Sequence, residues 1–201
     1  MRSRRAIGAT LFLCLAASQA AILVLTPVLP ALASDLGVST ATAGQLRTIS
    51  GLSAGVTALL VGLLASRVGL RGLLGSGLVL LAVGSGASAV APSFAAIAIA
   101  QLAIGVGIGL SYTAALAAVA DWTTPADRSR VLAVALLGPP TAWIVGMPLS
   151  GLVGEASWRI AWIAAPFAFS LVALIVLPAG SPHRLRRREL IFARCSLTQA
   201  C

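Results

Sequence analysis

Charged and aromatic residues are scarce in this sequence. Of its 201 residues, 9% are charged and 5% are aromatic, whereas 59% are hydrophobic and the mean hydropathy is +1.01. Lysine is absent, and the 14 basic residues are all arginine. A chain with so few charges cannot cover the surface of a soluble globular domain. These absences therefore predict an integral membrane protein.

Residues that could hold a metal or perform catalysis are also few. Three cysteines, Cys14, Cys195 and Cys201, have no metal-ligand spacing, and the one histidine is His183. Residues 51–55 fit the G-x-S-x-G pattern of a hydrolase nucleophile, but they lie inside an apolar run with no histidine base nearby. The glycines at 105, 107 and 109 lack the strand and the following acid of a dinucleotide site. We expect neither an enzyme nor a bound metal or cofactor.

Long uncharged runs dominate the chain, and residues 6–34 and 72–120 contain no charged side chain. Such runs are too long for barrel strands and too long for the apolar region of a signal peptide, whereas about 20 apolar residues cross a bilayer as a helix. We predict an all-α bundle over residues 1–180. Its six spanning helices are expected at about 8–32, 44–65, 72–91, 95–119, 131–153 and 160–178. Residues 181–201 are expected to form a basic cytoplasmic tail or a truncated central loop.

The arginines indicate how such a bundle lies in the membrane. An even number of spans places both termini on one side, and that side receives 12 of the 14 arginines, leaving only Arg47 and Arg159 opposite. Because basic residues concentrate on the cytoplasmic side, we expect both termini in the cytoplasm of a multi-pass protein of the cell inner (plasma) membrane. The arginines form small groups between apolar runs rather than one basic face, which argues against a nucleic-acid partner.

Polar residues inside the predicted spans are candidates for function, because each is costly in lipid unless it faces a partner or a water-filled path. Gln19 and Thr26 fall on one helical face, and so do Gln101 and Tyr112. Hydrogen bonding between helices is the alternative explanation for these side chains. Arg47 either extends to the outer interface or faces the path, where it attracts an anionic group or pairs with an acid.

Acidic residues are missing from the predicted spans. The five acids are Asp35, Asp121, Asp127, Glu155 and Glu189, and all of them lie in expected links or in the tail. We therefore predict that no carboxylate embedded in the membrane is available to carry a proton.

The link between the second and third predicted helices carries the most informative motif. Residues 62–72 read GLLASRVGLRG. This pattern resembles the loop between helices two and three of the major facilitator superfamily, G-x-x-x-D-R-x-G-R-R. The matching residues are Gly62, Arg67, Gly69 and Arg71. Ser66 stands where the family has aspartate, and it can supply only a neutral hydrogen bond.

Further motifs of that family follow in the expected order. Residues 29–39 resemble the end of its first helix, and Pro125-x-x-Arg128-x-Arg130 is similar to the link after its fourth. Residues 101–109 read Q-x-x-x-G-x-G-x-G, where the family has arginine in place of Gln101. Gly138, together with Gly146, Pro148 and Gly151 in a G-x-P-x-x-G pattern, resembles the helix-five antiporter motif of the drug-and-sugar efflux branch. A Trp-Arg pair at 158–159 follows it.

The resemblance implies a fold and a mechanism. A six-helix half of this superfamily consists of two inverted three-helix repeats, and two halves enclose a site near the membrane midplane. We therefore expect the N-terminal half of a proton-coupled exporter of small molecules (drugs or sugars) that works by alternating access. Because helices one and four line the cavity in the family, Gln19, Gln101 and Tyr112 become candidate substrate contacts. A proton carrier would then lie in the other half or near an end such as Asp35.

The partners expected from the resemblance are the lipid bilayer, a small-molecule substrate and a second six-helix half. That half is either a missing C-terminal half or a second copy of the chain in a homodimer. The half by itself is expected to give no efflux. A non-transporting membrane assembly or regulatory subunit is the alternative from another functional class.

Overall fold

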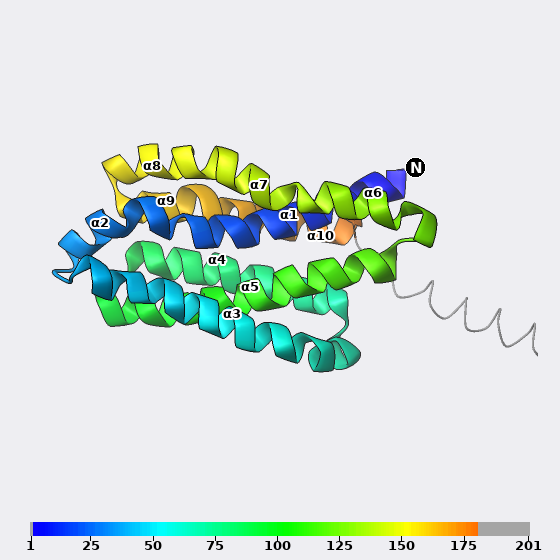
Figure 1. The fold of residues 1–201 in the computed structure, drawn as a ribbon, viewed down its shortest axis with the longest axis horizontal. Coiled ribbons are helices and arrows are strands. Elements are labelled where there is room, and N and C mark those ends of the chain that lie inside the picture. The colour runs from blue at the N-terminus through cyan, green and yellow to red at the C-terminus, as the bar shows by residue number, and fades with distance from the viewer. Residues whose placement is uncertain (1, 181–201) are drawn as a thin grey trace, which may run out of the picture.

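The computed structural model describes residues 2–180, and all regular structure within them is helical (Figure 1). Six segments are long and apolar enough to cross a membrane. Their bounds are Arg4–Asp35, Thr40–Val68, Leu70–Val90, Phe94–Trp122, Pro125–Ala156 and Trp158–Pro178. The predicted all-α fold with six spans is therefore confirmed. The predicted tail, residues 181–201, lies outside the described residues.

Three of the spans are continuous helices and three are broken. The continuous ones are α3 (Thr40–Val68), α4 (Leu70–Val90) and α5 (Phe94–Trp122). The first span consists of α1 (Arg2–Leu23) and α2 (Leu25–Asp35). The fifth contains α6 (Pro125–Leu136), α7 (Gly138–Thr141), the π-helical turn η1 (Ala142–Gly146) and α8 (Met147–Ala156). The sixth contains α9 (Trp158–Trp162), the π-helical turn η2 (Ile163–Phe167) and α10 (Ala168–Gly180).

Short polar signals begin and end these helices. The Ser39 hydroxyl accepts a hydrogen bond from the backbone N–H of Thr42 (3.0 Å), and Ser93 accepts one from Ala96 (3.3 Å), so both serines cap a helix N-terminus. Gly69 alone separates α3 from α4 and has φ +80°, which favours glycine. Apart from the C-terminal end of α4, the spans run beyond the ends expected from the sequence, and the links between them, except that between α4 and α5, are shorter.

These longer helices correct the expected positions of the acids. Asp35, Asp121, Asp127 and Glu155 lie in the terminal turns of helices rather than in the links. Each nevertheless stays at an end of the bundle, and Glu189 lies outside the described residues. Among residues 2–180, the middle of the bundle therefore contains no carboxylate.

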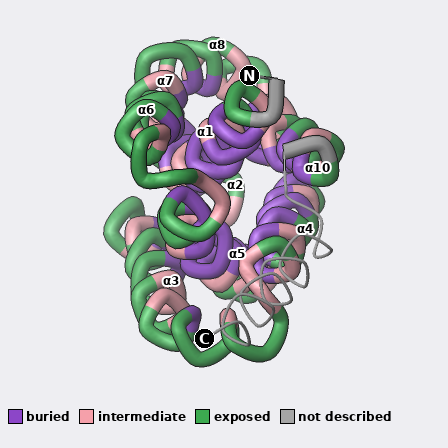
Figure 2. Tube along the Cα trace, turned by 90° about the vertical axis from the view of Figure 1, so that its right-hand side faces the viewer, coloured by how far each residue is buried: buried purple, intermediate pink, exposed green. Residues whose placement is uncertain are grey.

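The packing order shows two inverted three-helix repeats, as the resemblance implied. The first repeat comprises α1–α4, and the second comprises α5–α10. The first span of each repeat packs against the second and third spans of the other: α1 contacts α6, α7 and α10, while α5 lies against α3 and α4. Figure 2 shows the bundle from one end, with α1 and α5 in its middle. The antiparallel α1 and α5 are central to the fold.

The two sides of the bundle differ in how they are covered. On one side α4 packs against α9, η2 and α10. On the other side α3 and the fifth span lie at the edge (Figure 2), and only 11% and 28% of their apolar windows are buried, against 67% for the first span. We call this second side the α3 side. It is the most exposed part of the apolar surface.

Small residues allow the closest helix contacts. A Cβ atom added at Gly107 would lie 2.8 Å from the Gly77 carbonyl oxygen of α4, and one at Gly109 would lie 2.6 Å from the Ala54 carbonyl oxygen of α3. One at Gly105 would overlap the carbonyl oxygen of Ser50, also on α3. In lipid, such close backbone approach is a main source of helix association. The glycine motif of the fourth span is thus a packing element for two neighbours.

Candidate functional site

The centre of the bundle contains a polar contact between its two central helices. The hydroxyls of Ser18 on α1 and Ser111 on α5 lie 2.8 Å apart, and both side chains are fully buried. Each hydroxyl also bonds a carbonyl one turn back on its own helix, Cys14 (3.0 Å) and Gly107 (2.7 Å). The two hydroxyls have only two protons to donate, so at most two of these three contacts are hydrogen bonds at any one time. The pair fixes where α1 and α5 meet.

Gln19 and Tyr112 directly follow the two bonded serines. In antiparallel helices that touch at one residue each, the next residue of each helix turns to the same side. Both side chains are half-buried, and within residues 2–180 neither makes a hydrogen bond. The structure therefore brings these two predicted residues together on one side of the crossing, with polar groups free to bind a ligand.

That side is the α3 side. Tyr112 lies three residues after Gly109 and seven after Gly105, so it shares their face of α5, which contacts α3. Gln19 lies seven residues before Thr26, whose hydroxyl bonds Arg47 of α3. Tyr112 therefore lies on the face of α5 that packs against α3, and Gln19 lies on the span whose Thr26 bonds α3.

Gln101 occupies a different environment from Tyr112, although both fall on one face of α5. Its side chain is 1% exposed, and its Nε2 atom has no hydrogen-bond partner within the described residues. Gln101 lies one turn before Gly105, which places it level with the turn of α3 that precedes Ser50. It is buried inside the bundle rather than open to the α3 side.

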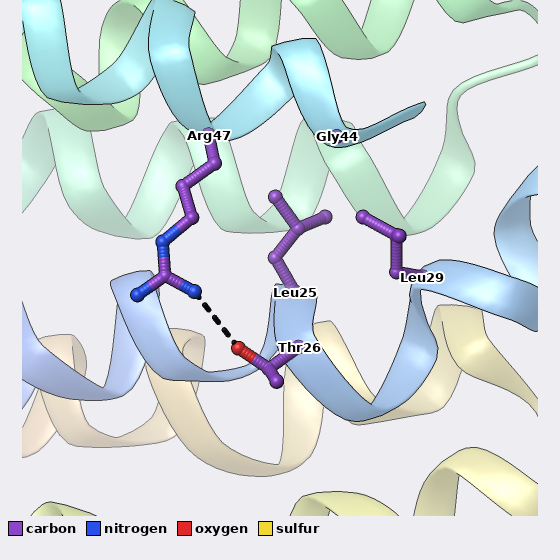
Figure 3. A pocket seen from close by; sticks show the side chains of 5 residues that line it. All are labelled: Leu25, Thr26, Leu29, Gly44 and Arg47. Carbon is purple, nitrogen blue, oxygen red and sulfur yellow. Dashed lines mark hydrogen bonds between the residues drawn. The ribbon is translucent and has the colours of Figure 1, made fainter. Parts of the chain in front are cut away.

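Arg47 lines a pocket between the first and second spans (Figure 3). One guanidinium nitrogen donates to the Thr26 hydroxyl at 3.0 Å. The pocket has a volume of about 220 Å³ and is lined by Leu25, Thr26, Leu29, Gly44 and Arg47. The sequence indicated Thr26 and Arg47 separately as polar residues within spans. The structure shows that a hydrogen bond between them links α2 to α3. We call this feature the Arg47 pocket.

The residues of the predicted gating motif surround the turn between α3 and α4. Ser66 is exposed, and its hydroxyl donates to the Leu63 carbonyl of its own helix (2.7 Å). Arg67 and Arg71 are exposed on either side of Gly69, while a Cβ at Gly62 would have no neighbour within 4 Å. Within the part of the chain that the structure describes, Ser66 makes no hydrogen bond to another helix.

The helix-five motif divides into an inward and an outward set. A Cβ at Gly138 would lie 2.5 Å from the Phe12 carbonyl oxygen of α1, and one at Gly146 would lie 3.5 Å from Leu23. Pro148 is exposed, and a Cβ at Gly151 would meet nothing within 4 Å. The π-helical turn η1 ends two residues before Pro148. Proline has no N–H to donate, so the motif interrupts the regular bonding of this span.

Sequence reasoning missed a polar cluster at the end of the bundle that holds Asp35. The Asp35 carboxylate accepts from the Trp158 indole (3.1 Å) and from the Arg159 guanidinium (3.2 Å). Arg159 also donates to the carbonyl of Ala91 (2.8 Å), and its guanidinium lies 4.3 Å from the centre of the Trp158 ring. The sequence indicated Asp35 and the Trp-Arg pair at 158–159 separately, and the arginine count placed Arg159 on the side away from the termini, but nothing in the sequence joined these residues.

A second ion pair lies at the opposite end of the bundle. Arg4 of α1 donates to Asp127 of α6 at 2.6 Å. The two polar contacts link the first span to the sixth at one end and to the fifth at the other. Within the described residues, no group of three metal-binding side chains occurs.

Comparison with known proteins agrees with this architecture. Among solved structures, the fold is similar to the crystal structure of a D-xylose-proton symporter, with a TM-score of 0.74 and 16% sequence identity. The similarity covers 96% of this chain and 52% of that one, so this chain spans about half the length of that transporter. No curated protein matches the sequence. The family model described as Major Facilitator Superfamily matches residues 11–199. The chain therefore belongs to the Major Facilitator Superfamily.

Proposed function

We propose that this chain is the N-terminal half of a proton-coupled small-molecule efflux transporter that works by alternating access. The observation that carries the proposal is the pair Gln19 and Tyr112, which have free polar groups on one face of the central crossing. α5 has 29 residues, and Ser111 lies near its middle, so this pair is close to the midplane, where substrates bind in this fold. The direction of transport rests on the helix-five motif, which resembles that of the efflux branch.

A second six-helix half is proposed to cover the α3 side. Four glycines of α3, spaced by seven, four and seven residues, form one stripe along the helix: Gly44, Gly51, Gly55 and Gly62. A Cβ added at any of them would have no neighbour within 4 Å. Glycine stripes let a second helix approach closely in lipid. The partner is a C-terminal half or a second copy of this chain.

The proposed substrate path predicts water at the midplane. In a background with Cys195 and Cys201 replaced by serine, we expect a membrane-impermeant maleimide to label Gln19→Cys and Tyr112→Cys in cells. Val83→Cys is the matched control, because Val83 is exposed on α4, on the opposite side of the bundle from α3. A thiol in lipid stays protonated and should not react. Equal labelling at all three positions, or none at Gln19→Cys and Tyr112→Cys, would contradict the proposal.

Transport itself gives a second test. We expect the purified chain by itself to move no ethidium into proteoliposomes when a proton gradient is applied, because one half does not enclose a path. Vesicles without protein are the control for leakage. Gradient-driven uptake by the purified chain would show instead that it transports as a monomer or homodimer.

A further inference from the structure

Among the described residues, no acidic side chain forms an ion pair with Arg47. Within residues 2–180 its one hydrogen-bond partner is a neutral hydroxyl, Thr26. The two ion pairs of the described residues are Arg4–Asp127 and Arg159–Asp35, so of the two acids at this end, Asp35 pairs with Arg159 and Glu155 forms no ion pair with Arg47. Arg47 therefore has no acidic partner within residues 2–180. Its remaining N–H groups are available to an external anion.

The level of Arg47 in the membrane follows from its helix. The 19 residues from Thr48 to Ser66 carry no charge and separate Arg47 from Arg67. At 1.5 Å per residue they span about 29 Å, which is close to the thickness of the hydrocarbon layer. The two arginines therefore lie at opposite boundaries of that layer, with Arg47 where acid groups meet apolar chains.

The walls of the pocket are suited to the apolar part of a ligand. Leu25 and Leu29 of α2 and the bare backbone at Gly44 line the pocket on one side of the guanidinium (Figure 3). A volume of about 220 Å³ is below the roughly 300 Å³ at which pockets hold whole drug-sized molecules. It is sufficient for an acid group and the first few carbons of a chain.

The guanidinium is also held in one direction. Its bond to Thr26 engages one nitrogen, and the planar group then presents its other N–H donors as a fork. Forked donors match the two oxygens of a carboxylate or phosphate.

We propose that the Arg47 pocket binds the acid group of an amphiphilic anion, a carboxylate or phosphate attached to an apolar chain. This binding needs neither a proton gradient nor a second half, so it is independent of the proposed efflux. The same chemistry is offered by a free anionic amphiphile and by the headgroup of an anionic lipid.

Equilibrium dialysis of the full chain in phosphatidylcholine nanodiscs tests the pocket, with radiolabelled decanoate as the probe. We expect saturable binding above that of empty nanodiscs, and binding of decanol, the neutral analogue, to be much weaker. Arg47→Gln should weaken decanoate binding about 10- to 100-fold, because a hydrogen bond to a charged group is lost. Arg67→Gln removes the same charge from the other end of the same helix and should leave binding unchanged.

A second variant keeps the test informative if Arg47→Gln does not fold. Gly44→Leu adds a side chain where a Cβ has no neighbour within 4 Å, so it should fill the pocket without disturbing the bundle. We expect it to weaken decanoate binding about tenfold while the charge of Arg47 remains. The proposal is overturned if decanol binds as well as decanoate, or if neither variant changes binding.

Adding phosphatidylglycerol to the nanodiscs distinguishes the two sources of the anion. Displacement of decanoate at a few mole per cent of phosphatidylglycerol identifies the lipid headgroup as the occupant. Undiminished decanoate binding identifies a free amphiphile.

Discussion

At the scale of single residues, the glycines of the fourth span show how one motif serves two neighbours. Gly105 and Gly109 face α3, while Gly107 faces α4, because residues four apart share a face and residues two apart do not. The spacing G-x-G-x-G therefore lets α5 approach two helices closely at one level of the bundle. This is a packing role, which accounts for the motif without any ligand.

The first prediction compares two glycines of different surroundings. Gly105→Ala should lower the free energy of unfolding by about 1–3 kcal/mol relative to Gly51→Ala, since only the former places a methyl group against the backbone of another helix. The gain in helix propensity is the same for both and cancels. Unfolding by sodium dodecyl sulfate from maltoside micelles, followed by circular dichroism, measures the difference. Equal stability of the two variants would contradict the packing role of Gly105.

From the sequence, two residues could be predicted to share a face only when they belong to the same helix. Spacing placed Gln19 with Thr26 and Gln101 with Tyr112 because helical periodicity is local. It could not show that Thr26 meets Arg47, or that Gln101 is buried while Tyr112 is half-exposed, because those properties depend on which helices are neighbours. Gly69 was recognisable as a turn, but the helical state of Arg67 and Arg71 was not.

At the scale of elements, the fifth span is the least regular. It contains three α-helical pieces and one π-helical turn between Pro125 and Ala156. Pro148 follows η1 by two residues and has no backbone N–H, so it cannot donate the regular α-helical hydrogen bond to the carbonyl of Ile144. The π-helical turn is where the span adjusts its direction, with Gly146 against α1.

The second prediction concerns this proline. Pro148→Ala should restore the missing N–H and let α8 continue the regular bonding, which would move its exposed residues relative to α6. Spin labels at the exposed positions Leu136 and Leu152 would report the change as a shifted distance in pulsed electron paramagnetic resonance. Pro92→Ala, in the link between α4 and α5, is the control and should leave that distance unchanged. An identical distance distribution in Pro148→Ala would show that the break does not depend on the proline.

Elements as a whole were predicted better than their interruptions. Six apolar runs gave six spans, because length and hydropathy determine insertion. Pro148 follows η1 and Pro166 lies within η2, so the sequence marks the region of each break, but the residues that form the π-helical turn also depend on packing against α1 and α4. The helices extend beyond the uncharged runs because their terminal turns, which contain arginine or acidic residues, remain helical at the membrane surface.

At the scale of the whole molecule, the arginines are distributed unequally between the two ends of the bundle. Within the described residues, the end of the bundle that holds Gly69 also holds the exposed arginines Arg4, Arg5, Arg67, Arg71, Arg128 and Arg130. The other end has Arg47 and Arg159. From the positive-inside rule we predict that the Gly69 end lies in the cytoplasm.

The third prediction tests this orientation with two small exposed residues. With Cys195 and Cys201 replaced by serine, Ala41→Cys should react with an impermeant maleimide in intact cells. Ala126→Cys should react only after the cells are permeabilised. Both alanines are exposed in the first turn of a helix, so the pair is matched in local structure. The reverse pattern would require the opposite orientation.

The exchange of first helices between the repeats has a consequence for how the chain folds during synthesis. Most of the surface that α1 buries is supplied by the fifth and sixth spans, which are translated more than 100 residues later. During synthesis, the face of α1 that contacts the fifth and sixth spans therefore lacks these neighbours until the last span is inserted. Neither three-helix repeat has a complete core, so the six spans form one cooperative folding unit. A chain that ended after α4 would leave the most buried helix of the protein without its neighbours.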